Sequence, residues 1–204
     1  MKPKITARVA RREGVNLDGR PKIDRILQKR SYAPGQHGPT SRTRQTDYGK
    51  QLREKQKAKR MYGLTEKQFS NWFWIVAKKR GNTAEQFIKR LESRFDNAVF
   101  RAGFAKTRAE ARQRVGHAQF DVNGKSVNIP SYLLREGDVV TVRKNKQQKG
   151  PWRGLVEAMK NHVPPSWLSV DPGAYSFKVT GAPTETEMKQ VPFDTKLIVE
   201  FYSR

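Results

Sequence analysis

The residues of this chain with the clearest chemical potential are arginines that recur at helical spacing in its middle third. Five of them share this pattern: Arg94, Arg101, Arg108, Arg112 and Arg114. A guanidinium group carries five N–H donors in a planar fork, and it can bind phosphate through two parallel hydrogen bonds. A row of such groups on adjacent helices can follow a polyanion, although each one alone is also explained as a solvated surface charge. The spacing therefore predicts contacts with nucleic-acid phosphates.

Further candidate phosphate-binding residues lie on either side of this row. They are Arg11, Arg12, Gln36, His37, Arg53, Lys55, Lys57, His117 and Lys125. The two histidines could stack on bases or donate to phosphate, but a lone histidine is more often a structural hydrogen-bonding residue. Lys125 follows Asn123-Gly124 at an expected hairpin tip, where RNA contact and ordinary solvation are both open.

The acidic residues form no recognisable catalytic or metal-binding pattern. They are scattered, and several fall at expected helix caps and turns, as Glu110 and Asp138 do. Asp96 is better explained as the partner of a nearby arginine than as a general base. The sequence has no cysteine, which excludes disulfides, thiolate zinc sites and a cysteine nucleophile. It also has no glycine-rich phosphate loop, so we expect no enzymatic activity, no metal and no cofactor.

The charge of the chain is strongly positive and unevenly distributed. Its 204 residues include 42 Lys and Arg against 19 Asp and Glu, which gives a net charge of +23. Residues 1–60 carry 18 basic and 5 acidic side chains, whereas residues 161–204 carry 4 and 5. This gradient favours a nucleic-acid partner for the N-terminal three quarters of the chain. An anionic membrane surface is the alternative, but the basic segments lack the continuous apolar face of an interfacial helix, and we expect no membrane partner.

Most of the elements that would position these side chains are expected to be helical. A basic helix is predicted over residues 51–60. Three later helix starts carry a threonine followed three residues on by Gln or Glu, the pattern of a capping box, at Thr65, Thr83 and Thr107. Each of these helices is expected to end at a glycine, at Gly81, Gly103 and Gly116. The first has an aromatic face that is typical of a core: Phe69, Trp72, Phe73 and Val76.

The helix that begins at Thr83 is expected to run unbroken to residue 102. One face is apolar and contains Phe87, Leu91, Phe95, Ala98 and Ala102. The opposite face is basic and polar and contains Arg90, Arg94, Asn97 and Arg101. This pattern predicts a single amphipathic helix whose arginines face away from the core.

After residue 118 the sequence changes to the alternation that is typical of strands. Strands are expected near residues 120–122, 127–129, 139–142, 167–170 and 177–179, with a short helix near 155–160 and a last apolar run at 197–201. Asn123-Gly124 between alternating apolar residues is the strongest short-range hairpin signal. The fold class is therefore expected to be α+β. Residues 1–45 show almost no apolar periodicity, so we expect them to form no core and to become ordered on RNA.

Five consecutive motifs between residues 91 and 140 follow an order that resembles the S4 RNA-binding domain. They are Leu91-Glu92-Ser93-Arg94-Phe95-Asp96-Asn97, Arg101-Ala102-Gly103-Phe104, Thr107-Arg108-Ala109-Glu110-Ala111-Arg112-Gln113, Val122-Asn123-Gly124-Lys125 and Gly137-Asp138-Val139-Val140. Outside them, three segments resemble signatures of the bacterial small-subunit ribosomal protein S4 family: Pro34-Gly35-Gln36-His37-Gly38, Leu52-Arg53-Glu54-Lys55-Gln56-Lys57 and the last eight residues from Leu197. The resemblance covers nearly the whole chain.

The resemblance implies two lobes, which together with the basic arm expected from composition divide the chain into three parts. These are a basic arm at 1–45, a helical lobe at 46–92 completed by the tail at 185–204, and an inserted S4 domain at 93–184 with a helix-turn-helix-like corner on a small antiparallel sheet. It implies a structural component of the small ribosomal subunit that binds ribosomal RNA at a multi-helix junction and nucleates assembly. It further implies contact with ribosomal protein S5, a place near the mRNA entrance channel, a contribution to translational accuracy, a cytoplasmic location on the ribosome and no homo-oligomer.

One departure from the family pattern concerns zinc. Many members carry two cysteine pairs in the arm, and the spacing places those positions at Ala7, Ala10, Arg20 and Arg25. None of these can bind zinc, so RNA contacts or local packing must hold the arm, as in the zinc-independent branch of the family. Two alternatives to the ribosomal role remain: an RNA-modifying enzyme with the same domain, for which the chain has little room, and a free RNA chaperone or translational repressor. Cofractionation in high salt would distinguish the ribosomal role from a free chaperone or repressor, since a core ribosomal protein should remain with the small subunit.

Overall fold

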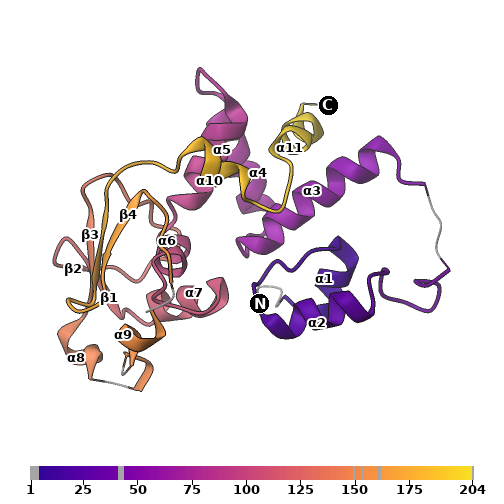
Figure 1. The fold of residues 1–204 in the computed structure, drawn as a ribbon. Coiled ribbons are helices and arrows are strands. Elements are labelled where there is room, and N and C mark those ends of the chain that lie inside the picture. The colour runs from indigo at the N-terminus through magenta and orange to yellow at the C-terminus, as the bar shows by residue number, and fades with distance from the viewer. Residues whose placement is uncertain (1–4, 41–43, 149, 153, 160–161, 204) are drawn as a thin grey trace. The chain divides into compact units, whose positions relative to one another are not determined.

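The chain forms two compact units. The computed structural model describes residues 5–40, 44–148, 150–152, 154–159 and 162–203. The first unit comprises Met1–Phe87 and Gln190–Arg204, and the second comprises Ile88–Lys189. Helices make up the first unit and a sheet with helices makes up the second (Figure 1). This mixture confirms the predicted α+β class.

The first unit is a helical assembly with an aromatic core. Its helices are α1 (Ala7–Glu13), α2 (Pro21–Lys29), α3 (Asp47–Met61), α4 (Glu66–Ala77), the first part of α5 (Thr83–Glu92) and α11 (Thr195–Tyr202). The ring of Tyr202 stacks on Phe73 with centroids 4.6 Å apart, and Phe87 meets Phe69 edge-on at 5.1 Å. Phe69, Phe73 and Val76 of the predicted face of α4 are core, whereas Trp72 is only half-buried. The apolar run at 197–201 belongs to a helix.

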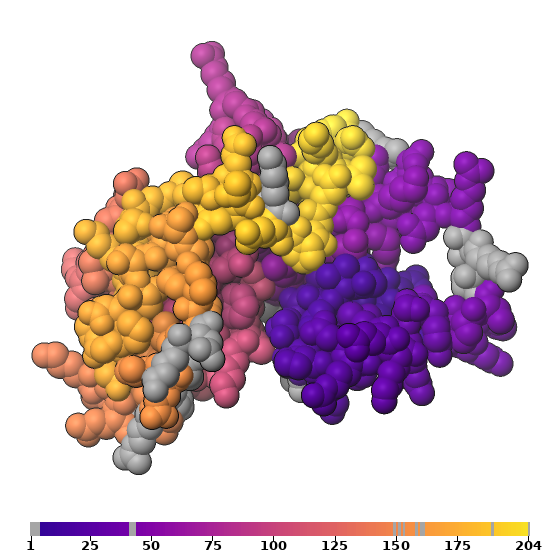
Figure 2. Space-filling model, in the orientation of Figure 1, coloured from indigo at the N-terminus to yellow at the C-terminus, as the bar shows by residue number. Residues whose placement is uncertain are grey.

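Residues 5–40 fold into a helical hairpin of α1 and α2. Ala10, Leu17 and Ile23 are buried, so the expectation that this segment forms no core is wrong. The space-filling view shows the segment, indigo to violet, as a closely packed body (Figure 2). Both helices are too short to show a periodicity that stands out in the sequence, and a few well-placed apolar side chains are enough to close the hairpin.

Two arginines fasten the loops of this hairpin. Arg20 donates to the carbonyl oxygen of Ile5 and pairs with Asp18. Arg11 donates to the carbonyl oxygens of Tyr32 and Ala33 at 3.1 and 3.3 Å, and its guanidinium lies 4.7 Å from the centre of the Tyr32 ring. Hydrogen bonds and local packing thus hold the segment without cysteine ligands.

The second unit begins with the end of α5 and continues through α6 (Phe95–Arg101) and α7 (Arg108–Gly116). Smaller elements follow later in the chain: α8 (Lys144–Gln147), the 3-10 turn at Gly150–Trp152, α9 (Leu155–Ala158) and α10 (Glu185–Lys189). The single helix expected from Thr83 to residue 102 is wrong. Arg94 takes an extended backbone with ψ of 139° and forms an isolated bridge with Leu133, which separates α5 from α6. No glycine or proline marks this break, so the regular apolar spacing concealed it.

Helix starts follow the predicted caps in two cases of three. Thr65 makes a complete capping box, and the Thr107 hydroxyl accepts from the third amide of α7. At the start of α5 the cap is Asn82 and not Thr83, because Asn82 Oδ1 accepts from the amide of Ala84 at 3.1 Å. Asparagine is as good an N-cap as threonine, so the sequence offered two adjacent candidates.

Helix ends agree less well with the predicted glycines. Gly103 follows α6 with a positive φ of 82°, as expected. In contrast, α4 ends at Ala77, before Gly81. Gly116 is the last residue of α7, and Ala118 takes the left-handed conformation there with φ of 49°.

The sheet of the second unit has five antiparallel strands in the order β2-β1-β3-β5-β4. Their bounds are β1 (Phe120–Val122), β2 (Lys125–Ser126), β3 (Val139–Val142), β4 (Leu168–Asp171) and β5 (Ser176–Val179). The predicted hairpin turn is confirmed, because Asn123 and Gly124 both have positive φ, 50° and 76°. The strand expected at 127–129 is displaced to Lys125–Ser126.

One face of this sheet is covered by helices (Figure 1). Alternate residues of β1, β3 and β5 point to that side, where Phe120, Val140 and Phe177 are buried. They pack in one cluster with Phe95 of α6 and with Trp152. Burial of each such side chain stabilises the fold by about 1.5–3 kcal/mol. The α6–α7 corner therefore rests on a rigid platform.

Candidate nucleic-acid interface

A buried charge network joins α6 to α7. Arg94 is 1% exposed, and its Nε and Nη2 donate to the two carboxylate oxygens of Asp96 at 2.9 and 2.6 Å. Arg112 of α7 donates to the same carboxylate at 3.1 Å. Asp96 is thus a partner of nearby arginines, as predicted. Burial lowers the pKa of Arg112 although Asp96 opposes the effect, and arginine remains protonated at neutral pH.

A second buried carboxylate, that of Glu92, links α5 to α6 and α7. It accepts from Nδ2 of Asn97 at 2.8 Å and from Nε and Nη2 of Arg101 at 2.9 and 3.0 Å. The Oδ1 of Asn97 accepts in turn from Nε of Arg108 at 2.9 Å. The guanidinium of Arg108 also lies 4.4 Å from the centre of the Phe100 ring. These contacts fix the angle between the helices.

Arg114 is held inside the corner in the same way. It pairs with Glu110 at 2.6 Å, donates to the carbonyl oxygen of Phe104 at 2.6 Å, and its guanidinium lies 4.6 Å from the centre of the Trp152 ring. Its donors therefore satisfy groups of the protein itself.

The arginine row is therefore not a solvent-facing stripe. Arg94 is buried and cannot reach RNA in this conformation, which corrects its assignment as an RNA contact. Arg101, Arg108, Arg112 and Arg114 are half-buried, and the side chains of Arg101 and Arg112 are 28% and 30% exposed. The residues were found from their spacing, but the acidic partners that hold them could be identified only from the fold.

The solvent-facing side of α7 carries a different set of residues. Lys106, Ala109, Gln113, Gly116 and His117 are exposed there. Lys125, at the hairpin turn, is exposed as well. Of the candidates from the sequence in this unit, His117 and Lys125 are the ones that are fully available to a partner.

The candidates on α3 are engaged in internal ion pairs. Arg53 and Arg60 both bind the carboxylate of Glu13, whose side chain is fully buried. Lys57 pairs with Glu54 at 2.6 Å. Lys55 is buried. Arg53, Arg60 and Lys55 thus tie α3 to neighbouring elements, whereas the Lys57 pair lies within α3; the prediction that these cations contact phosphate stays a prediction.

The Lys55 ammonium sits between a carboxylate and two aromatic rings. It donates to Glu66 at 2.7 Å and lies 4.4 Å from the centre of the Phe201 ring. Lys59 binds the same carboxylate at 2.7 Å. Burial alone would raise the pKa of Glu66, but the two lysines outweigh it and lower the pKa. The Tyr202 hydroxyl donates to Glu66, and burial together with this carboxylate raises the pKa of Tyr202.

Residues 5–40 present most of their cations to solvent. Of the predicted residues, Arg12, Gln36 and His37 are exposed and Arg11 is half-buried. Sequence reasoning missed five further exposed cations: Arg8, Lys22, Arg25, Lys29 and Arg30. Within the described residues, none of these five takes part in an ion pair. Their availability could have been predicted from the sequence, since none of the five has an acidic residue three or four positions away within its helix.

Two family models match consecutive parts of the chain. The ribosomal protein S4/S9 N-terminal domain matches residues 3–92, and the S4 domain matches residues 93–140. The chain is also 48% identical over 201 residues to small ribosomal subunit protein uS4A of Symbiobacterium thermophilum, which covers 97% of this chain and 96% of that protein. The chain belongs to the ribosomal protein uS4 family. Other uS4 relatives include those of Natranaerobius thermophilus, 44% identical, and Polaromonas naphthalenivorans, 46% identical, each covering 97% of this chain and 96% of the relative.

Membership of the uS4 family confirms the resemblance seen in the sequence. Proteins of this family are structural components of the small ribosomal subunit and not enzymes, and in bacteria this places them on the ribosome in the cytoplasm. The RNA-modifying alternative is thereby excluded. Among the described helices, none is long and apolar enough to cross a membrane.

Proposed function

We propose that this chain binds small-subunit ribosomal RNA at a multi-helix junction and helps to nucleate assembly of the subunit. The observation that carries the proposal is the separation of its cations into two sets. One set is paired with carboxylates and holds the fold together, as at Asp96 and Glu92. The other set is exposed and takes part in no ion pair among the described residues. It includes six cations of residues 5–40, and further members lie along the rest of the chain, as at Lys78, Lys79 and Arg80 after α4. Unpaired cations on a preformed surface attract phosphates without the cost of first breaking internal ion pairs.

The second unit contributes a rigid corner to this binding. Because buried ion pairs fix α6 against α7, the exposed side of α7 is presented in one orientation. Lys106, Gln113 and His117 on that side can donate to phosphate or base edges, and Lys125 is exposed at the hairpin turn of the same unit. Arg101 and Arg112 are candidates for secondary contacts through the parts of their side chains that reach solvent.

A neighbouring protein is the second kind of partner that we propose. The uS4 family resemblance implies ribosomal protein S5, near the channel where mRNA enters, and with it an effect on translational accuracy. Two features support a protein contact: the near-neutral charge of residues 161–204, and the exposure of two large apolar side chains on α4, Trp74 and Ile75, at 49% and 45%. Neither feature is needed for binding RNA.

Chemical probing of ribosomal RNA tests the proposal. The purified chain should protect one discrete junction of small-subunit ribosomal RNA, and it should stay with the small subunit through a high-salt wash. A free RNA chaperone or repressor would be released by that wash and would protect many sites weakly. Diffuse protection combined with release in high salt would therefore overturn the proposed role.

A further inference from the structure

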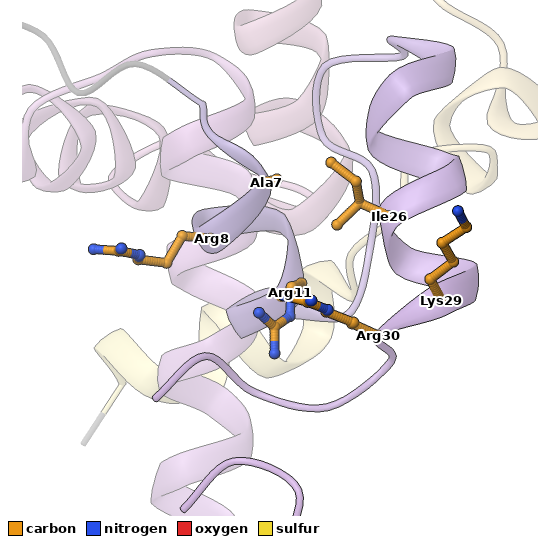
Figure 3. Close-up of a pocket in the computed structure, with 6 residues that line it drawn as sticks. All are labelled: Ala7, Arg8, Arg11, Ile26, Lys29 and Arg30. Atoms are coloured by element: carbon orange, nitrogen blue, oxygen red, sulfur yellow. The ribbon is translucent and has the colours of Figure 1, made fainter. Parts of the chain in front are cut away.

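The hollow between α1 and α2 does not gather its cations around one point. It has a volume of about 410 Å³ and is lined by Ala7, Arg8, Arg11, Ile26, Lys29 and Arg30. The charged ends of Arg8 and Lys29 extend away from each other and from the space between the helices (Figure 3). In the second unit, by contrast, several polar groups converge on the side chain of one residue, Asn123.

Asn123 is bound at three points by Asp138 and Val139, where β3 begins. Its backbone amide donates to the carbonyl oxygen of Val139 at 2.8 Å. In its side chain, Oδ1 accepts from the amide of Val139 at 2.9 Å, and Nδ2 donates to Oδ1 of Asp138 at 2.8 Å. Exposed side chains normally exchange between rotamers within nanoseconds. These hydrogen bonds therefore hold an exposed side chain in one orientation.

Asp138 is itself fixed by the surrounding sheet. Its Oδ2 accepts from the amide of Arg135 at 2.7 Å, and its own amide donates to the carbonyl oxygen of Arg135 at 3.1 Å. Its carbonyl oxygen accepts from the amide of Val179 in β5 at 2.9 Å. The contacts that hold Asn123 thus depend on the folded sheet, and they are lost when the second unit unfolds.

Asn123 precedes Gly124, and such a pair can react with itself. Asparagine is among the thermolabile residues of proteins. The backbone nitrogen of the next residue attacks Cγ, the new N–Cγ bond closes a five-membered succinimide ring, and the Cγ–Nδ2 bond breaks. The proton of the attacking amide leaves with Nδ2 as ammonia, and water then opens the ring to aspartate or isoaspartate. Glycine has no Cβ to shield its nitrogen, and Asn123-Gly124 is the only Asn-Gly pair in the chain.

We propose that Asn123 is a deamidation site that is controlled by folding. Asp138 and Val139 restrain the reaction in the folded chain, and unfolding of the second unit releases it. Ring closure requires Cγ of Asn123 to reach the nitrogen of Gly124, whereas both polar atoms of the side-chain amide are held by residues of another strand. The reaction therefore proceeds from the fraction of molecules in which these contacts are open.

The product of the reaction does not fit the folded turn. An aspartate at position 123 places a carboxylate oxygen where Nδ2 now donates to Asp138, so one hydrogen bond is replaced by repulsion between like charges. Isoaspartate adds a carbon atom to the backbone of the two-residue turn that sets the register of β1 against β2. A chain that reacts while it is unfolded therefore regains this hairpin less readily, and the site records time spent unfolded.

Mass spectrometry of tryptic peptides measures the reaction in the full-length chain. Folded chain and chain unfolded in guanidinium chloride are kept at the same pH and temperature. Deamidation of Asn123 should be at least about tenfold slower in the folded chain, because two side-chain hydrogen bonds must open first. Asn128, which is exposed in the same unit and precedes Ile129, is the internal control and should react slowly in both states. Equal rates for Asn123 in the two states, or a faster reaction in the folded chain, would overturn the proposal.

Substitution of Asp138 separates its contact from folding in general. Asp138→Ala removes the acceptor of Nδ2, and deamidation under folding conditions should become about threefold faster or more. Asp138→Asn keeps an acceptor oxygen and should react more slowly than Asp138→Ala, while Lys125→Ala in the same turn should react like the unsubstituted chain. An unchanged rate in Asp138→Ala, or equal acceleration in both Asp138 variants, would refute the role of this hydrogen bond.

A direct replacement tests the product independently of these rates. Asn123→Asp reproduces the aspartate form, and Asn128→Asp makes the same chemical change at an exposed position of the same unit. Asn123→Asp should unfold at a lower urea concentration than the unsubstituted chain, whereas Asn128→Asp should not. Equal unfolding midpoints for Asn123→Asp and the unsubstituted chain would show that the product fits the folded turn, and the proposal would be wrong.

Discussion

Truncation of Arg94 distinguishes a buried structural arginine from a surface cation. Arg94 and Asp96 are 1% and 5% exposed, and two hydrogen bonds of 2.9 and 2.6 Å join them. Removing one member of a buried ion pair costs about 3–5 kcal/mol, because the other charge remains without its partner in a medium of low dielectric. In Arg94→Ala, Asp96 keeps the contact with Arg112, which offsets part of that cost. We therefore expect a loss of about 2–4 kcal/mol, against about 0.5 kcal/mol or less for a solvent-facing arginine.

Urea unfolding measures this loss. Trp152 and Trp167 are buried in the second unit, so fluorescence includes a signal from the unit in which the change is made. A loss of about 3 kcal/mol lowers the urea midpoint by roughly 1–3 M for m values of small proteins. Lys125→Ala, at the exposed hairpin turn, is the control and should leave the midpoint unchanged. Should Arg94→Ala unfold at the same midpoint as this control, the network contributes nothing and the reasoning from burial is refuted.

Further predictions concern the first unit and metal content. Glu13→Ala removes the buried carboxylate that binds Arg53 and Arg60. Amide exchange in α1 should become at least about tenfold faster, as expected for a loss of stability of about 1.4 kcal/mol or more. Unchanged exchange rates would contradict this prediction. Because the pKa of Glu66 in the fold lies below its value of 4.5 in the unfolded chain, its contribution to stability is full above that pH and is lost as the pH falls through the folded pKa. Glu66→Gln should therefore flatten the acid limb of the stability curve, and an identical limb would refute the assignment. Elemental analysis should find no stoichiometric zinc, since the described residues contain no group of three or more His, Cys, Asp or Glu side chains placed to hold a metal. One equivalent of zinc that a chelator removes, with loss of RNA affinity, would contradict this prediction.

Local signals in the sequence were sufficient to predict elements whose ends are stabilised by residues adjacent in the sequence. The capping box at Thr65 and the Asn123-Gly124 turn were predicted because the residues that stabilise them are neighbours in sequence. The break between α5 and α6 was missed because its cause is distant: the amide of Phe95 donates to the carbonyl oxygen of Tyr132 at 2.8 Å. The α1–α2 hairpin was missed for a different reason, since its core depends on a few residues with no repeating period.

The prediction of site residues is limited in the same way, by contacts that depend on the fold. Spacing identified arginines with the right chemistry but could not tell which of them the protein uses internally, since Arg94 and Asp96 are two residues apart and would lie on different faces of a continuous helix. The break in the helix is what brings their side chains together. In contrast, the exposure of Arg8 and Arg30 could have been inferred from the lack of acidic neighbours at helical spacing.

The acidic residues determine which cations remain available to RNA. In a chain with 42 basic and 19 acidic side chains, the carboxylates of Glu13, Glu92 and Asp96 are buried, and each binds two basic or amide side chains. These carboxylates orient helices, and each neutralises one positive charge. The attractive field comes from the cations without a carboxylate partner, together with the one positive charge left in each network where two arginines share a carboxylate. Net charge alone would predict that neutralising Asp96 strengthens RNA binding, because the chain becomes more positive. The structure predicts that Asp96→Asn instead weakens RNA binding. Without the carboxylate, the buried guanidinium of Arg94 loses its ionic partner and α6 and α7 lose their fixed angle. The exposed side of α7 is then no longer presented in one orientation.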